Sequence, residues 1–245
     1  MKTRLELSMQ PQPDETTCGP TCLHAVYHYH GDPIPLAQVI AETSALEEGG
    51  TLGVFLANHA LRRGYRAAIY TYNLHVFDPT WFAAGGDDLH SRLRSQLEAK
   101  TDHSSGRKGD RKLRSASEAY IEFLEQGGSM RFEVLSPALI AAPLARGVPI
   151  LTGLSATYLY RSAREIPSDG QPDDLRGEPV GHFVVLCGYN QEDGTVLVAD
   201  PAVPNPLSRD PYYEIDADRV LGAILLGIVT YDANLVLIEP PLPPR

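Results

Sequence analysis

The stretch QPDETTCGPTC, residues 12–22, decides how the first part of this chain folds. Gly-Pro follows Cys18 directly, and proline suits an early helical position, where its missing N–H group is not needed. Gly31 ends the run, as glycine often does just after a helix. The sequence therefore predicts a helix over residues 20–30, with a cysteine at its N-terminal tip.

A cysteine in this position has the surroundings of a nucleophile. The thiolate is the reactive form, and a helix N-terminus or a protonated imidazole lowers a thiol pKa. We expect Gly19 to leave room beside the sulfur for a substrate carbonyl. Gln12 lies six residues earlier, so its amide and the Cys18 backbone N–H could form an oxyanion hole, with Gln10 as a competing donor. The structural alternative is a buried thiol at the start of a helix.

A second segment supplies a histidine and an acid. Residues 181–189 are Gly-His-Phe-Val-Val-Leu-Cys-Gly-Tyr, and residues 195–200 are Thr-Val-Leu-Val-Ala-Asp. Both runs have the composition of strands, and the residues between them are of turn type. We predict a hairpin in which His182 begins one strand and Asp200 ends the next. The structural alternative is a buried strand followed by an Asp-Pro turn.

The register of this hairpin decides whether the two side chains can meet. A five-residue loop over 190–194 pairs Tyr189 with Thr195 beside the loop. The same register brings Val184 opposite the aspartate, and the histidine then lies diagonally across from it on the same face. A two-residue turn would instead place the two side chains on opposite faces.

The remaining patterns place most helices early and most strands late, which indicates an α+β fold with N-terminal helices packed on an antiparallel sheet. Further helices are expected near 35–46, 51–63, 88–99, 115–126, 137–146 and 216–225. Strands are expected at 66–72, 132–135, 149–154, 182–189, 195–200, 212–215 and 235–239. We interpret residues 1–245 as a single domain.

Residues 85–114 are polar and charged, and they are interpreted as an insertion or a flexible excursion from that domain. The basic residues here are Arg107, Lys108, Arg111, Lys112 and Arg114. Because they lie in a Gly/Ser-rich stretch, they are expected to form a solvated loop rather than a binding patch.

Aromatic and acidic residues mark a second long loop. Tyr158 and Tyr160 precede residues 161–180, which are rich in Pro, Gly and Asp, and these tyrosines are candidates for lining a substrate groove. Asp173, Asp174 and Glu178 are expected on the solvated edge of this loop, where an acidic rim would favour basic peptides.

Composition excludes several classes of function. The chain has 245 residues and a formal charge of −10, which gives no electrostatic support for nucleic-acid binding. No apolar run is long enough to span a bilayer, and the N-terminus lacks the pattern of a signal peptide. Three cysteines without export signals suggest reduced thiols in the cytoplasm. His24 and His28 share a helix face, but no further ligand completes a metal site, and no cofactor is expected.

Together the two segments resemble the papain-like clan, and specifically the bacteriocin-processing cysteine peptidases that cleave after double-glycine leaders. The matching residues are Gln12, Cys18 with Gly19, His182, and Asp200 with Pro201. The resemblance implies a papain-like fold in which Cys18 is the nucleophile and His182 the general base and then acid. It also implies that Asp200 orients the histidine and that Gln12 is the oxyanion donor.

The function expected from these residues is a cytoplasmic cysteine peptidase that hydrolyses a peptide bond. The chain lacks the transporter segments of many family members, so it is more similar to stand-alone relatives found beside peptide-modifying enzymes, which are its expected partners. Leader removal or peptide maturation is the implied role. Two alternatives remain: transfer of the acyl group to another acceptor, and a catalytically silent domain that binds peptides. The sequence leaves the oligomeric state open.

Overall fold

The computed structural model describes residues 2–47, 49–83, 88–101 and 108–242. Within them, eight strands form one sheet in the order β3-β2-β8-β4-β5-β6-β7, and β1 pairs with β5. Only the β2–β3 pair is parallel. The strands are β1 (Lys2–Arg4), β2 (Arg66–Thr71), β3 (Ser129–Arg131), β4 (Ile150–Ser155), β5 (Gly181–Asn190), β6 (Thr195–Ala199), β7 (Tyr212–Asp216) and β8 (Asn234–Glu239).

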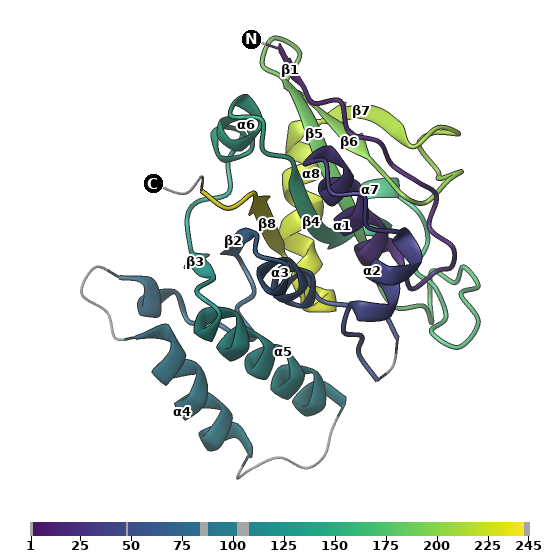
Figure 1. Cartoon of the computed structure of the whole chain (residues 1–245). Helices are drawn as coiled ribbons and strands as arrows, with labels where there is room; N and C mark the ends of the chain where they lie inside the picture. Colours follow the sequence, from purple (N-terminus) through teal and green to yellow (C-terminus); the bar gives the residue numbers. More distant parts are fainter. Residues whose placement is uncertain (1, 48, 84–87, 102–107, 243–245) are drawn as a thin grey trace.

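Helices cover both faces of this sheet (Figure 1). Helices α1 and α3 lie in front of it and α8 lies behind, while α4 and α5 form a hairpin beside α3. The helices are α1 (Cys18–Tyr29), α2 (Leu36–Glu42), α3 (Gly53–Arg62), α4 (Leu89–Thr101), α5 (Lys108–Glu125), α6 (Pro137–Ala145), α7 (Ala156–Tyr160) and α8 (Ala217–Leu226), with short 3-10 turns η1 (Pro79–Phe82) and η2 (Gly227–Thr230). The predicted α+β class, with N-terminal helices on a mostly antiparallel sheet, is confirmed.

Two hydrophobic clusters, one on each face, hold these layers together. Strand β5 contributes to both because its side chains alternate. Phe183 and Val185 pack in the cluster that contains α1, α3 and α5, whereas Val184 and Leu186 pack in the cluster that contains α6 and α8. Burying one such side chain contributes roughly 1.5–3 kcal/mol. The near-continuous apolar run of β5 is therefore the pattern of a strand covered on both faces.

The hairpin of β5 and β6 differs from the predicted register at its loop. Asn190 pairs with Thr195, so the loop comprises residues 191–194 and is one residue shorter than expected. The predicted pairing of Tyr189 with Thr195 is therefore wrong. A polar loop of this composition does not by itself specify whether its first residue continues the ladder.

A bulge at Cys187 restores the predicted pairing further along the hairpin. The register shifts by one residue there, so that Val185 pairs with Ala199. The residue before Val185 then lies opposite Asp200, as predicted. Because strand side chains alternate with a period of two, this one extra residue returns His182 and Asp200 to the same face.

Several element boundaries differ from the predictions because of tertiary contacts. The first helix begins at Cys18, two residues early, since the carbonyl of Thr17 already accepts the Thr21 N–H group at 3.0 Å. Strand β3 covers Ser129–Arg131 rather than 132–135, where it can pair with β2. The short elements β1 and α7 were not predicted, because three to five residues carry too little periodicity.

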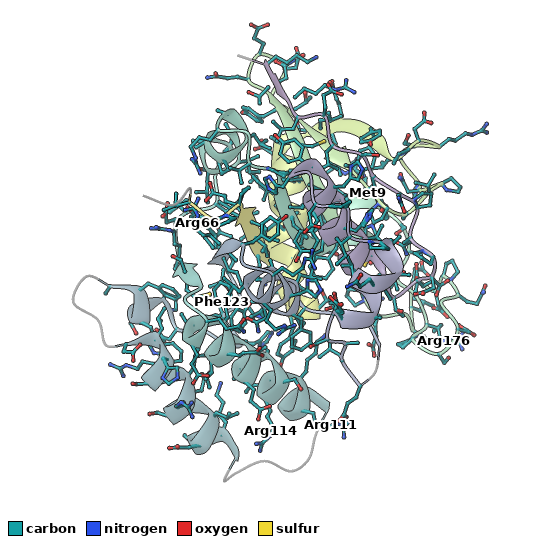
Figure 2. The ribbon with its side chains drawn as sticks, viewed as in Figure 1. Met9, Arg66, Arg111, Arg114, Phe123 and Arg176 are labelled. Carbon is teal, nitrogen blue, oxygen red and sulfur yellow. The ribbon has the colours of Figure 1, made fainter. Side chains whose placement is uncertain are left out.

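The basic residues predicted as a loop are helical from position 108 onward. Helix α5 begins at Lys108, and its lower end carries Arg111 and Arg114 (Figure 2). Lys112 Nζ donates to the carbonyl oxygen of Thr230 at 2.9 Å, and Arg111 lies 3.8 Å from a carboxylate oxygen of Glu47. The first contact holds the start of α5 against η2, and the second holds it near the loop before α3. Residues 85–87 and 102–107 of the predicted excursion lie outside the described residues.

A buried carboxyl group caps α3 from the turn before β8. Asp232 Oδ1 accepts the backbone N–H of Gly53 at 2.9 Å, and the residue is only 6% exposed. Burial raises its pKa to about 7, although the Gly53 hydrogen bond and the charge of Lys112 act in the opposite direction. The folded protein therefore holds a proton on this group that the unfolded chain releases near pH 4.

This raised pKa predicts a pH-dependent difference in stability for Asp232→Asn. Wild type loses the stabilising effect of the bound proton as the pH rises from about 4 through 7, because only the unfolded state is then ionised. The difference in free energy of unfolding between the variant and wild type, measured by urea denaturation, should therefore change with pH. From pH 4 to pH 8 it should shift in favour of the variant by on the order of 2–4 kcal/mol. Asp210→Asn, an exposed position, is the matched control. A difference that is constant across this range contradicts the prediction.

Candidate active site

Cys18 is the first residue of α1, and a rigid turn holds it there. Asp14 Oδ1 accepts the backbone N–H and the hydroxyl of Thr16 at 2.8 and 2.7 Å. The hydroxyl of Thr17 donates to the carbonyl oxygen of Asp14 at 3.1 Å. The first N–H groups of a helix have no partner within the helix and form the positive end of its dipole. The sulfur therefore lies where negative charge is favoured.

Gly19 is required for packing. A Cβ atom there would lie 2.4 Å from Thr51 Cγ2 and 3.3 Å from side-chain atoms of Leu56 and Phe183. The missing side chain thus allows the segment before α3 and strand β5 to approach α1. That Gly19 also leaves room beside the sulfur for a substrate carbonyl stays a prediction.

His182 contacts both of the other residues predicted with it. Its Nε2 lies 2.8 Å from Asp200 Oδ1, and the side chain of Cys18 lies close enough to the imidazole to raise its pKa. A carboxylate can only accept, so Nε2 carries a proton and Nδ1 is the ring atom left for the sulfur. The imidazole is 8% exposed and Asp200 is fully buried. Three segments distant in sequence therefore meet at one imidazole.

Charges within this group outweigh the effect of burial. Burial lowers the pKa of His182, but the hydrogen bonds and negative charges of Asp200 and Cys18 raise it to about 10. Burial also raises the pKa of Asp200, yet the hydrogen bond and charge of His182 bring it below its ordinary value. At neutral pH the two groups therefore form a buried ion pair, in which the imidazole is protonated.

Two tyrosines complete the surroundings of Asp200, and neither was predicted to bind the acid. The hydroxyls of Tyr160 and Tyr213 donate to Oδ2 at 2.7 and 2.8 Å, and the Ala202 N–H donates to Oδ1 at 2.9 Å. The ring of Tyr160 also lies 6.1 Å from the imidazole of His182. Tyr160 was expected in a substrate groove, but its hydroxyl binds the acid.

The Gln12 backbone is hydrogen-bonded to the residue that follows the acid, and its side-chain amide is hydrogen-bonded to Asp14. Its backbone N–H donates to the carbonyl oxygen of Pro201 at 2.9 Å, which ties the N-terminal loop to the end of the hairpin. Its amide Nε2 donates to the carbonyl oxygen of Asp14 at 2.9 Å, and Oε1 is buried without a hydrogen-bond partner in the described structure. Within the described residues, no hydrogen bond joins the Gln12 amide to Cys18.

The other two cysteines are buried in the core. Cys22 Sγ contacts the carbonyl oxygen of Phe183 at 3.3 Å, and Cys187 Sγ contacts that of Leu197 at 3.6 Å. Burial raises the pKa of both thiols, to about 12 for Cys187. Both should therefore remain neutral thiols that react slowly.

Metal-ligating side chains do not gather elsewhere in the part of the chain that the structure describes. The rings of His24 and His28 are 6.3 Å apart, and no group of three or more His, Cys, Asp or Glu residues there is arranged to hold a metal ion. Among the same residues, no helix has both the length and the apolar character needed to cross a membrane.

Comparisons with known proteins give structural similarities at low identity. No family model and no curated protein sequence matches the chain. The chain is similar to a double-glycine motif protease from an AMS/PCAT transporter, solved with a leader peptide (12% identity, TM-score 0.43, covering 97% of this chain and 94% of that one). It is also similar to the peptidase domain of Streptococcus ComA, a bifunctional ABC transporter (12%, 0.41, 96% and 99%), and to xylellain, a cysteine protease from Xylella fastidiosa (15%, 0.43, 98% and 85%).

The hydrogen bonds to Asp200 predict a specific loss of stability in Tyr213→Phe. The substitution removes a donor to a buried carboxylate, so the free energy of unfolding at pH 7 should fall by about 1.5–3 kcal/mol in urea denaturation. Acid unfolding should also begin at a higher pH, because the Tyr213 hydroxyl helps to hold the pKa of Asp200 low.

Tyr158→Phe is the matched control for this measurement, because the structure records no hydrogen bond for the half-exposed Tyr158 side chain. Its stability should stay within about 0.5 kcal/mol of wild type. Equal effects of the two substitutions would contradict the assigned role of Tyr213.

Proposed function

We propose that the chain is a papain-like cysteine peptidase that hydrolyses a peptide bond through Cys18, His182 and Asp200. One observation carries the proposal: the imidazole of His182 hydrogen-bonds a buried carboxylate and lies close enough to Cys18 for that side chain to raise its pKa. The high pKa of His182 favours an imidazolium beside the sulfur, which is the environment of a reactive thiolate.

In the first step the Cys18 sulfur attacks the carbonyl carbon of a peptide bond, and the carbonyl electrons move onto oxygen. The Cys18 N–H group at the start of α1 stabilises this oxyanion. The Gln12 amide is the second donor once it leaves its hydrogen bond with Asp14. His182 gives its Nδ1 proton to the leaving amine, and the C–N bond breaks to leave a thioester on Cys18.

In the second step the now neutral His182 accepts a proton from water, which attacks the thioester. The acid product leaves, and the sulfur and imidazole return to their charged forms. Asp200 remains a carboxylate throughout, holds Nε2–H by its hydrogen bond, and stabilises the imidazolium. The resemblance of the two sequence segments to peptidases of leader peptides favours a peptide or modified peptide as substrate, with leader removal as its role.

Selective alkylation tests this proposal without a known substrate. Iodoacetamide at pH 6–7 should modify Cys18 much faster than Cys22 and Cys187, because Cys18 lies at a helix N-terminus near the His182 imidazolium, whereas burial raises the pKa of the other two thiols. His182→Ala should lower the Cys18 rate by roughly 10²-fold or more, given the usual contribution of a positioned base. Peptide mapping by mass spectrometry identifies the modified thiol.

Cys18→Ser is the matched control, and it should remove the fast phase while leaving the slow labelling of the other thiols. Equal, slow labelling of all three cysteines in wild type would overturn the proposal. Adding amines to the thioester formed on Cys18 then separates hydrolysis from acyl transfer. Only a transferase converts the acyl group to a stable amide in preference to the free acid.

A further inference from the structure

A cavity of about 330 Å³ opens beside the beginning of β5. Its wall includes Ser155, which pairs with Gly181, the residue directly before His182. Thr157 also lines it, and its hydroxyl accepts the backbone N–H of Val180 at 2.9 Å. The cavity is therefore held by the same strand ends that hold the imidazole.

The lining of this cavity is mostly apolar, although it opens to solvent. Tyr158, Leu226 and Val229 contribute large side chains that are 46%, 41% and 52% exposed. A ring atom of Tyr158 packs against Gly222 so closely that a Cβ there would lie 2.9 Å away, which fixes the ring. A concave apolar surface next to a reactive centre is the usual form of a site for a substrate side chain.

The charged residues that line the cavity are both arginines. Within the described structure, the Arg161 guanidinium has no hydrogen-bond or ion-pair partner, and no carboxylate lines the cavity. Arg164 donates to the backbone carbonyl oxygens of Asp174 and Leu175, and its charge helps to lower the pKa of Asp173. In a chain with a net charge of −10, this concentration of positive charge is not a consequence of composition.

The acidic rim expected on the loop after α7 does not reverse this charge. Asp173 accepts the backbone N–H groups of Leu175 and Arg176, and its other oxygen binds the Arg176 side chain at 2.7 Å. Arg176 itself lies at the outer edge of the molecule (Figure 2). The carboxylate of Asp173 is thus bound mainly within its own turn, and Arg161 is the cation at the cavity that remains available to a ligand.

We propose that this cavity is a substrate subsite for an acidic peptide segment. It takes an apolar side chain against Tyr158, Leu226 and Val229, and a neighbouring substrate carboxylate pairs with Arg161. The inference rests on the proposed peptidase function, which supplies the peptide and the reacting sulfur. Charge complementarity of this kind selects the substrate and speeds its association more than it adds affinity.

Peptide ketones that trap the sulfur test the subsite directly. The probes are N-acetyl-tetrapeptide acyloxymethyl ketones. Each contains a leucine with Glu, Gln or Lys directly next to it, and a series of probes places this pair at each position of the tetrapeptide. The Cys18 sulfur displaces the acyloxy group as a carboxylate and forms a thioether, which intact mass spectrometry counts. With the pair at the position that reacts fastest, wild type should react about 3–10-fold faster with the Glu probe than with the Lys probe. High salt should reduce this ratio.

Arg161→Glu should reverse the order of the Glu and Lys probes. Arg146→Glu makes the same charge change at the exposed end of α6 and should leave the order unchanged. Val229→Ser should slow the leucine probes relative to probes with serine in place of leucine. Equal rates for Glu and Lys probes in every frame, an unchanged order in Arg161→Glu, or no modification by any leucine probe would each overturn the subsite.

Iodoacetamide separates a failure of the subsite from a failure of the peptidase. This small neutral reagent does not need the cavity, so fast labelling of Cys18 together with no charge preference overturns the subsite alone. Slow labelling by iodoacetamide overturns the peptidase proposal, and the subsite with it.

Discussion

The carboxylate of Asp200 is the constraint on which the rest of the site depends. It is fully buried, and a buried carboxylate without partners costs several kcal/mol. Four donors prevent this cost: His182 Nε2 and the Ala202 N–H on one oxygen, and the hydroxyls of Tyr160 and Tyr213 on the other. Because the acid must be satisfied in the folded state, these donors are fixed in place, and the imidazole is fixed with them.

This constraint connects the chemistry to the sheet. The donors come from α7, β5, β7 and the turn after β6, so the acid is satisfied only when β4–β7 have assembled in their observed order. The bulge at Cys187 is part of the same requirement, because it returns the histidine to the face of the acid. The cysteine arrives separately, at the tip of α1, so the site joins the helical layer to the strands.

Much of this arrangement could be predicted from the sequence because its parts are marked by local signals. Cys18 precedes a Gly-Pro helix start, His182 begins an apolar strand, and Asp200 precedes a proline. The α+β class and most elements followed from periodicity and turn residues. The pairing opposite Asp200 was also predicted, although the loop was one residue shorter than expected and a bulge made up the difference.

What could not be predicted depends on contacts between distant segments. The roles of Tyr160 and Tyr213 require the order of the strands, which periodicity does not contain. Gly19 faces Thr51 only after α1 and the segment before α3 have packed together. The early start of α5 reflects the contact of Lys112 with η2. In each case a tertiary contact outweighs the local preference.

The protonation state of His182 tests whether the imidazole and Asp200 form a buried ion pair. Nitrogen-15 NMR of histidine-labelled protein reports whether each ring nitrogen carries a proton. Both nitrogens of His182 should be protonated at pH 8 in wild type. Asp200→Asn and Cys18→Ala should each lower the pH at which the ring loses its proton. A ring in wild type that is neutral at pH 8 and titrates near pH 6.5, like a free histidine, would contradict it.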